Sequence, residues 1–83
     1  MPGMTRTVLT FGTFDVFHVG HLLVIQRAAE LGDRLVVGVS ADALNLRKKG
    51  REPVFGEAGR MAIVAALKPV DEVFLEESLE AKR

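Results

Sequence analysis

Hydrophobic residues along this chain occur in two kinds of run, and the short continuous runs predict β-strands. Val8–Phe11 and Leu35–Val39 are nearly uninterrupted stretches of apolar residues bounded by polar ones. The second of these runs is typical of a strand buried on both faces, as parallel strands are. A third short run, Asp71–Leu75, predicts a further strand.

The segments between these runs carry apolar residues at helical spacing. Leu22–Leu31 predicts a helix, and Gly32 occupies the position expected for a glycine just after its C-terminus. Ser40 is expected to cap a short helix over Asp42–Leu46. Glu57–Leu67 predicts a second long helix that stops near the following proline. Strands alternating with helices predict an α/β fold, a three-stranded parallel Rossmann-like sheet that is half of a doubly wound one.

Length and composition restrict the class of protein. A chain of 83 residues allows a single small domain, residues 1–83, and 48% apolar with 27% charged residues is a globular composition. A formal net charge of zero argues against nucleic acid as a partner. The chain has no cysteine, no apolar run long enough to span a membrane and no secretory signal at its N-terminus. We therefore expect a cytoplasmic protein without a membrane partner.

Both histidines of the chain, His18 and His21, lie where the first predicted strand passes into the first predicted helix. Backbone N–H groups at a helix N-terminus attract anions, and the helix dipole adds to this attraction. Two imidazoles at such a point suggest a site for a phosphate whose charge changes during a reaction. Gly20 between them would let a triphosphate approach the backbone. The alternative is a glycine-containing turn with two incidental surface histidines.

The residues of this junction resemble the signature of a known enzyme family. The signature runs Gly12-Thr13-Phe14-Asp15-x-x-His18-x-Gly20-His21. The likeness continues through Ala28, Leu31–Asp33, Leu35–Val37, Ser40, Asp42, Asn45, Leu46, Arg60 and Val70–Val73. This pattern is similar to the small cytidylyltransferases, and most of all to glycerol-3-phosphate cytidylyltransferases. The His-x-Gly-His element alone is shared by a wider nucleotidyltransferase superfamily.

The resemblance implies a reaction in which CMP is transferred from CTP to a small phosphorylated alcohol, preferably glycerol 3-phosphate, and pyrophosphate leaves. Mg²⁺ would accompany the triphosphate as cofactor, and we expect no metal-ligating residues in the chain. In such a reaction His18 and His21 would be catalytic and would stabilise charge on the phosphoryl oxygens. By the resemblance, Gly12, Thr13 and Phe14 would line the nucleotide pocket together with the two histidines and Gly20.

A basic segment after the second strand is the next candidate. Arg47-Lys48-Lys49-Gly50-Arg51 is predicted to form a loop at the carboxyl edge of the sheet, where ligands of open α/β folds bind. Charge runs are otherwise commonly solvated surface loops. The resemblance implies that Lys48 or Lys49 matches a phosphate-binding lysine. We assign Lys48 as catalytic and Lys49 as substrate-binding.

Two further residues are assigned to the acceptor side. Arg60 matches a family arginine and would help to position the acceptor, the alternative being a surface salt bridge with Glu57. Asp15 would contact the substrate or, alternatively, cap the turn in which it lies.

The family pattern continues beyond the length of this chain, with further strands and a late Arg-Thr-x-Gly-Ile-Ser-Thr-Thr-type segment. In the family's strand order, 3-2-1-4-5, a three-stranded portion leaves Val8–Phe11 at an exposed edge, which favours association, and we expect a homodimer. We expect an N-terminal portion of a cytidylyltransferase. One alternative is an FAD-synthetase-like or other adenylyltransferase. Another is a non-catalytic nucleotide-binding module completed by another chain.

Overall fold

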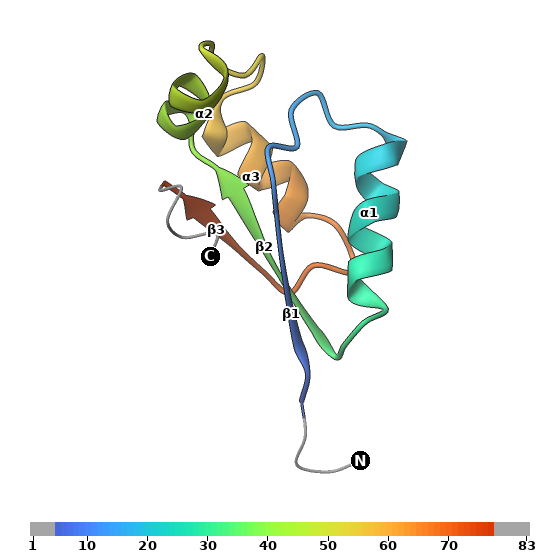
Figure 1. Cartoon of the computed structure of the whole chain (residues 1–83). Helices are drawn as coiled ribbons and strands as arrows, with labels where there is room; N and C mark the ends of the chain where they lie inside the picture. Colours follow the sequence, from blue (N-terminus) through green and yellow to red (C-terminus); the bar gives the residue numbers. More distant parts are fainter. Residues whose placement is uncertain (1–4, 78–83) are drawn as a thin grey trace.

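The computed structural model describes residues 5–77, and in these the predicted alternation of strands and helices is present (Figure 1). The elements are β1 (Thr7–Gly12), α1 (Val19–Ala29), β2 (Arg34–Ser40), α2 (Asp42–Lys49), α3 (Glu57–Ala65) and β3 (Glu72–Glu76). The expected α/β class with three parallel strands is confirmed.

The sheet has the order β1-β2-β3, with β2 in the middle and both of its pairings parallel. Val37 of β2 lies between Thr10 of β1 and Val73 of β3. Among the described residues, β1 therefore forms one edge of the sheet, as the sequence predicts. In Figure 1 the strands run in the same direction, so their carboxyl ends meet at one edge near α2.

Helices α1 and α3 cover the same face of the sheet. Ile25 of α1 and Val64 of α3 are fully buried and belong to one core cluster with alternate residues of β2. The cluster consists of Phe14, Ile25, Leu35, Val37, Val39 and Val64. Both crossovers therefore pass over one side, as right-handed βαβ connections require when successive strands are added in one direction.

The opposite face of β2 is covered by aromatic side chains. Phe11 of β1 and Phe74 of β3 meet edge to face, with ring centroids 5.8 Å apart. A Cβ atom on Gly38 would lie 2.7 Å from each of these rings. The middle strand therefore needs a glycine at this position, and the apolar run of β2 is explained by burial on both faces.

The structure corrects two helix boundaries. Ser40 is the last residue of β2 and does not cap α2, whose N-cap is Ala41 and has no side-chain cap bond. Helix α2 also extends to Lys49, so the first three residues of the predicted basic loop are helical. Ser40 is buried because the pairing of β2 with β3 extends to this residue, whose partner is Glu76.

The left-handed glycine at a helix end is Gly50 rather than Gly32. Gly50 has a φ of 77° and donates its N–H to Leu46 at the end of α2. Helix α1 ends at Ala29 with right-handed backbone at its C-cap. Gly32 is required for close packing instead, because a Cβ atom there would lie 2.6 Å from the carbonyl oxygen of Arg6.

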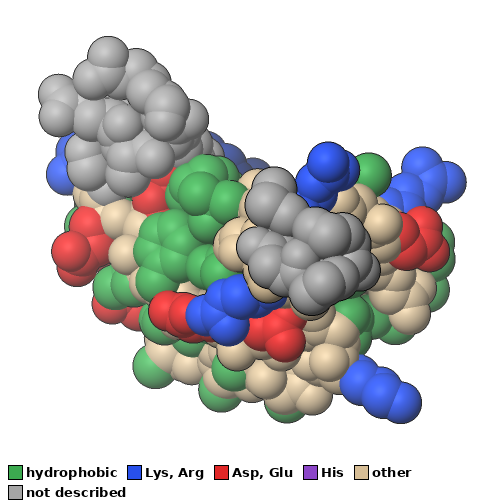
Figure 2. Space-filling view, turned by 90° about the horizontal axis from the view of Figure 1, so that it is seen from below, with side chains coloured by type: hydrophobic (Ala, Val, Ile, Leu, Met, Phe, Trp, Pro, Cys, Tyr) green, Lys and Arg blue, Asp and Glu red, His purple; other side chains and the backbone are tan. Residues whose placement is uncertain are grey.

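The end of the molecule at which the strands begin carries mixed charges. Figure 2 shows acidic and basic side chains beside hydrophobic ones on this face, and no histidine is visible there. Arg34, at the start of β2, forms an ion pair with Glu72 at the start of β3. In the part of the chain that the structure describes, no helix is long and apolar enough to cross a membrane.

Candidate active site

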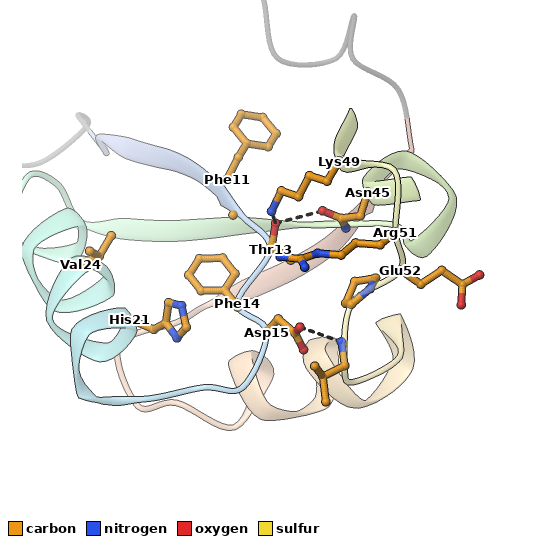
Figure 3. A pocket seen from close by; sticks show the side chains of 13 residues that line it. Phe11, Thr13, Phe14, Asp15, His21, Val24, Asn45, Lys49, Arg51 and Glu52 are labelled. Atoms are coloured by element: carbon orange, nitrogen blue, oxygen red, sulfur yellow. Dashed lines mark hydrogen bonds between the residues drawn. The ribbon is translucent and has the colours of Figure 1, made fainter. Parts of the chain in front are cut away.

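A pocket of about 620 Å³ opens at the carboxyl edge of the sheet. It is lined by residues 11–15 at the end of β1, His21 and Val24 of α1, Asn45 and Lys49 of α2, and residues 51–54 of the following loop. Figure 3 shows that Thr13, His21 and Lys49 face a common space from different elements. The carboxyl edge of a parallel sheet is where open α/β folds bind their ligands.

The two histidines form a reciprocal capping box at the start of α1. His18 is the N-cap residue, and its Nδ1 accepts a hydrogen bond from the Gly20 N–H at 3.0 Å. The His21 Nδ1 accepts from the His18 N–H at 3.2 Å. Their ring centroids are 4.0 Å apart. The two imidazoles accept from the His18 and Gly20 N–H groups, which have no carbonyl partner within the helix. These hydrogen bonds to the backbone fix the orientation of each ring.

This capping fixes the tautomer of both rings. A ring nitrogen that accepts a hydrogen bond carries no proton, so in the neutral imidazole the proton resides on Nε2. Burial beside Phe14 and Phe17 lowers the pKa of His21 below its ordinary value, and the neighbouring His18 lowers it further, while Asp15 opposes the shift. The lowered pKa favours the neutral form of His21, which can donate an Nε2–H bond while its Nδ1 stays in the cap.

Gly20 is required by the position of the imidazole. A Cβ atom at Gly20 would lie 2.7 Å from Cε1 and 3.0 Å from Nδ1 of His18. The glycine therefore leaves room for the capping ring. That it also admits a triphosphate stays a prediction.

The turn between β1 and α1 has two residues in the left-handed region. Phe14 has a φ of 53° and Val16 a φ of 47°. Such a conformation is strongly disfavoured for a β-branched residue, and strain of this kind is common at functional sites. The bend directs the Phe14 ring into the core, where it is 5% exposed, while the backbone of the turn stays at the pocket.

Asp15 holds this turn against the loop that follows α2. Its carboxylate accepts from the N–H groups of Val54 at 2.7 Å and Phe55 at 2.8 Å, and also from Val16 at 3.1 Å. Desolvation raises the pKa of Asp15, but these three N–H groups and the charge of Arg60 outweigh it, so the pKa lies below its ordinary value. Asp15 lines the pocket and ties the loop in place. Its contact with a substrate stays a prediction.

Arg60 is completely buried. Its guanidinium donates to the carbonyl oxygens of Thr13, Ser40 and Phe55 at 2.7 to 2.9 Å, and to Asp42 at 2.5 Å. The alternative of a surface salt bridge with Glu57 is wrong, because the arginine points inward. Four N–H groups of Arg60 donate to other groups of the protein. Arg60 therefore connects the segments that surround the pocket. A direct contact with the acceptor stays a prediction.

The two candidate lysines differ in position. Lys49 lines the pocket, and its Nζ donates to the Thr13 hydroxyl at 3.3 Å. Lys48 is not among the residues that line the pocket. Arg51 extends into the same space as Lys49, whereas Glu52 points away from it (Figure 3). The structure thus brings Lys49 rather than Lys48 to Thr13 and leaves the catalytic assignment of Lys48 a prediction.

Asn45 is a pocket residue to which the sequence analysis gives no role. It is 1% exposed and hydrogen-bonded to Thr13 and Ser40, and it lies one helical turn before Lys49. A polar residue four positions before a candidate phosphate lysine is the signal that could have indicated it, once the helix is known to reach Lys49.

No group of acidic, histidine or cysteine side chains among residues 5–77 is arranged to hold a metal ion. Asp15, a carboxylate that lines the pocket, already accepts three backbone hydrogen bonds.

The fold and the site together define the class of protein. A parallel α/β sheet with a pocket at its carboxyl edge, a basic helix end and a His-x-Gly-His cap is the arrangement expected of a nucleotidyltransferase. Comparison with known proteins agrees. The family model of cytidylyltransferase-like proteins matches residues 9–83, and the chain belongs to this family. The family and the relatives found are nucleotidyltransferases, which confirms the resemblance noted in the sequence.

The chain is similar to several named proteins and to one crystal structure. The chain is 40% identical to glycerol-3-phosphate cytidylyltransferase of Bacillus subtilis, over 94% of this chain and 60% of that one. It is 43% identical to FAD synthase of Thermoplasma acidophilum, over 87% and 49%. The crystal structure of the lipopolysaccharide core biosynthesis protein from Thermoplasma volcanium superposes with a TM-score of 0.81 at 37% identity, over 88% of this chain and 59% of that one. The chain thus spans about half to three fifths of these relatives.

Proposed function

We propose that this protein takes part in the transfer of CMP from CTP to a small phosphorylated alcohol, with glycerol 3-phosphate as the preferred acceptor. In this reaction an acceptor phosphate oxygen forms a bond to the α-phosphorus of CTP. The bond from that phosphorus to the oxygen bridging to the β-phosphate breaks, and pyrophosphate leaves with the electron pair. Membership of the cytidylyltransferase-like family and 40% identity to a glycerol-3-phosphate cytidylyltransferase support this assignment.

The observation that carries the proposal is the histidine capping box beside the pocket. The two imidazoles, held by their Nδ1 atoms, can present Nε2–H groups to phosphoryl oxygens, and His21 does so from the lining of the pocket. Donors that are already oriented stabilise developing charge without reorganising, which is the main contribution a protein makes to such a transfer. Lys49 adds a positive charge from α2 on the other side of the pocket.

Mg²⁺ belongs to this proposal as part of the substrate. The triphosphate oxygens would hold the ion, since the described residues offer no ligand cluster for it. The protein's own residues then orient the triphosphate and donate hydrogen bonds to its oxygens.

The nearest alternative is an adenylyl transfer of the FAD-synthase kind. It is favoured by two FAD synthases, of Thermoplasma acidophilum and Thermococcus sibiricus, which are 43% and 46% identical to this chain. These identities are as high as those to the cytidylyltransferases, so overall likeness does not decide the base.

Pyrophosphate release by the purified 83-residue chain tests the two proposals together. CTP or ATP is supplied with Mg²⁺, and glycerol 3-phosphate or FMN is supplied as acceptor. Release that requires CTP and glycerol 3-phosphate supports the first proposal, and release that requires ATP and FMN supports the second. Absence of release from every combination would contradict both activities for this chain by itself and favour a binding module completed by another chain.

A homodimer remains part of the proposal. The outer edge of β1 has no strand partner among the described residues, and Leu9 on this strand is 53% exposed. An unpaired apolar edge favours pairing with a second chain. Sedimentation equilibrium tests this expectation. A mass near that of one chain at micromolar concentration would contradict it.

A further inference from the structure

Three side chains behind the pocket form a closed ring of hydrogen bonds. The Asn45 Nδ2 donates to the Ser40 Oγ at 2.8 Å, the Ser40 Oγ donates to the Thr13 Oγ1 at 3.2 Å, and the Thr13 Oγ1 donates to the Asn45 Oδ1 at 3.1 Å. We call these three residues the Thr13–Ser40–Asn45 ring. They come from the ends of β1 and β2 and from α2, so the ring joins the elements that form the pocket.

The ring has one direction only. The Asn45 amide nitrogen can only donate, so the Ser40 hydroxyl accepts from it. The Asn45 amide oxygen can only accept, so the single proton of the Thr13 hydroxyl is used there. The remaining bond of the ring must therefore be donated by Ser40 to Thr13. Thr13 in turn sends its proton to the Asn45 carbonyl oxygen. Asn45 is anchored independently, because its Nδ2 also donates to the Ala41 carbonyl at 3.0 Å. The orientation of the Thr13 hydroxyl is thus set by the buried amide of Asn45.

The consequence concerns the lysine at the pocket. With its proton committed to Asn45, Thr13 has one lone pair for Ser40 and one left, and the Lys49 Nζ donates to this oxygen at 3.3 Å. Asn45 and Lys49 are four residues apart on α2 and therefore share a helix face. Figure 3 shows Lys49, Asn45 and Thr13 converging at one side of the pocket.

We propose that Asn45 is a positioning residue that places the Lys49 ammonium for a triphosphate, acting through the hydroxyl of Thr13. A lysine held in place before the ligand arrives loses less conformational freedom on binding. One N–H of Lys49 is held by Thr13, and the other two are directed to the anion. The inference rests on the proposed function only through the class of ligand, a triphosphate, and does not depend on the base or the acceptor.

A double-mutant cycle tests it with inorganic tripolyphosphate as the ligand, measured by isothermal titration calorimetry on the 83-residue chain. We expect Asn45→Ala to weaken binding about tenfold, a loss of about 1.4 kcal/mol of binding free energy. In a Lys49→Met background the same substitution should change the dissociation constant less than about twofold, because its effect passes through Lys49.

Arg47→Met provides the matched background, since it removes one positive charge from an exposed position of the same helix outside the pocket. There the tenfold effect of Asn45→Ala should persist. Thermal unfolding of each variant establishes that it is folded. If Asn45→Ala does not fold, Ser40→Ala opens the ring at a smaller side chain and enters the same cycle, with the same dependence on Lys49 expected.

Equal effects of the ring substitution in the Lys49→Met and Arg47→Met backgrounds would overturn the proposal and leave the ring a purely structural feature. Lack of tripolyphosphate binding by the unsubstituted chain would overturn it too. Coupled binding without pyrophosphate release in the assay above would uphold this inference while the proposed function fails, so the two failures are distinguishable.

Discussion

Replacing Arg60 is the perturbation for which the structure predicts the largest effect on stability. The guanidinium is completely buried and supplies four hydrogen bonds, three of them to backbone carbonyl oxygens at the ends of β1, β2 and the loop after α2. The fourth joins it to Asp42, whose other carboxylate oxygen accepts the Glu57 N–H at the start of α3.

The magnitude follows from what Arg60→Met would leave behind. Arg60→Met leaves the carbonyl oxygens of Thr13, Ser40 and Phe55 without this donor, at about 1–3 kcal/mol for each acceptor that stays buried and unpaired. Asp42 adds less, because its side chain is 34% exposed. A domain of 83 residues has a free energy of unfolding of about 4–12 kcal/mol at typical values per residue. We therefore expect Arg60→Met to lose a large fraction of the stability. Arg60→Lys keeps the charge with fewer donors, and we expect it to lose about half as much.

Urea unfolding followed by far-ultraviolet circular dichroism measures both variants by linear extrapolation. Arg27→Met serves as the control, because Arg27 is exposed in the last turn of α1 and its loss should change stability by less than about 0.5 kcal/mol. If Arg60→Met were as stable as Arg27→Met, the guanidinium would not be the buried connection described above.

Three further predictions concern the site. Because folding lowers the pKa of His21, the unfolded chain is protonated before the folded one as the pH falls, and stability should decrease below about pH 6.5. The NMR titration of His21 in the folded protein should have its midpoint below 6.5. A midpoint above 6.5 would contradict the burial argument. Gly20→Ala should displace the His18 imidazole and lower turnover with little change in the unfolding midpoint, and unchanged turnover would refute the steric argument. Lys49→Met should weaken tripolyphosphate binding more than Lys48→Met, as titration calorimetry can measure; the reverse order would restore the assignment made from the sequence.

Most of the fold could be predicted from the sequence because hydrophobic spacing and strand burial act over short segments. The continuous run Leu35–Val39 lies in the middle strand, and the edge position of β1 agrees with the strand order that the family resemblance implies. The helix boundaries were less predictable. Ser40 has the local preference of a cap, but strand pairing to β3 keeps it inside the sheet, which is a tertiary effect that no local pattern contains.

The site shows the same division. His18 and His21 could be found because they lie three residues apart at a strand–glycine–helix junction, where the candidate site residues are close together in the sequence. The burial of Arg60 could not, since its partners are 5 to 47 residues away in the chain and its charge is typical of a surface residue. The choice between Lys48 and Lys49 depends on the phase of α2, and the sequence analysis expected a loop there.

The most direct test of the account is the turnover of His18→Asn in the CTP-dependent pyrophosphate assay. Asparagine is a good N-cap residue, and its side-chain oxygen can accept the Gly20 N–H as Nδ1 does, but it has no donor at the position of Nε2. The account predicts a folded variant whose turnover falls about 100- to 1,000-fold, the usual loss of one oriented donor, while CTP affinity changes little. Turnover equal to that of the unsubstituted chain, or an equal loss in affinity, would contradict the role assigned to the histidine pair.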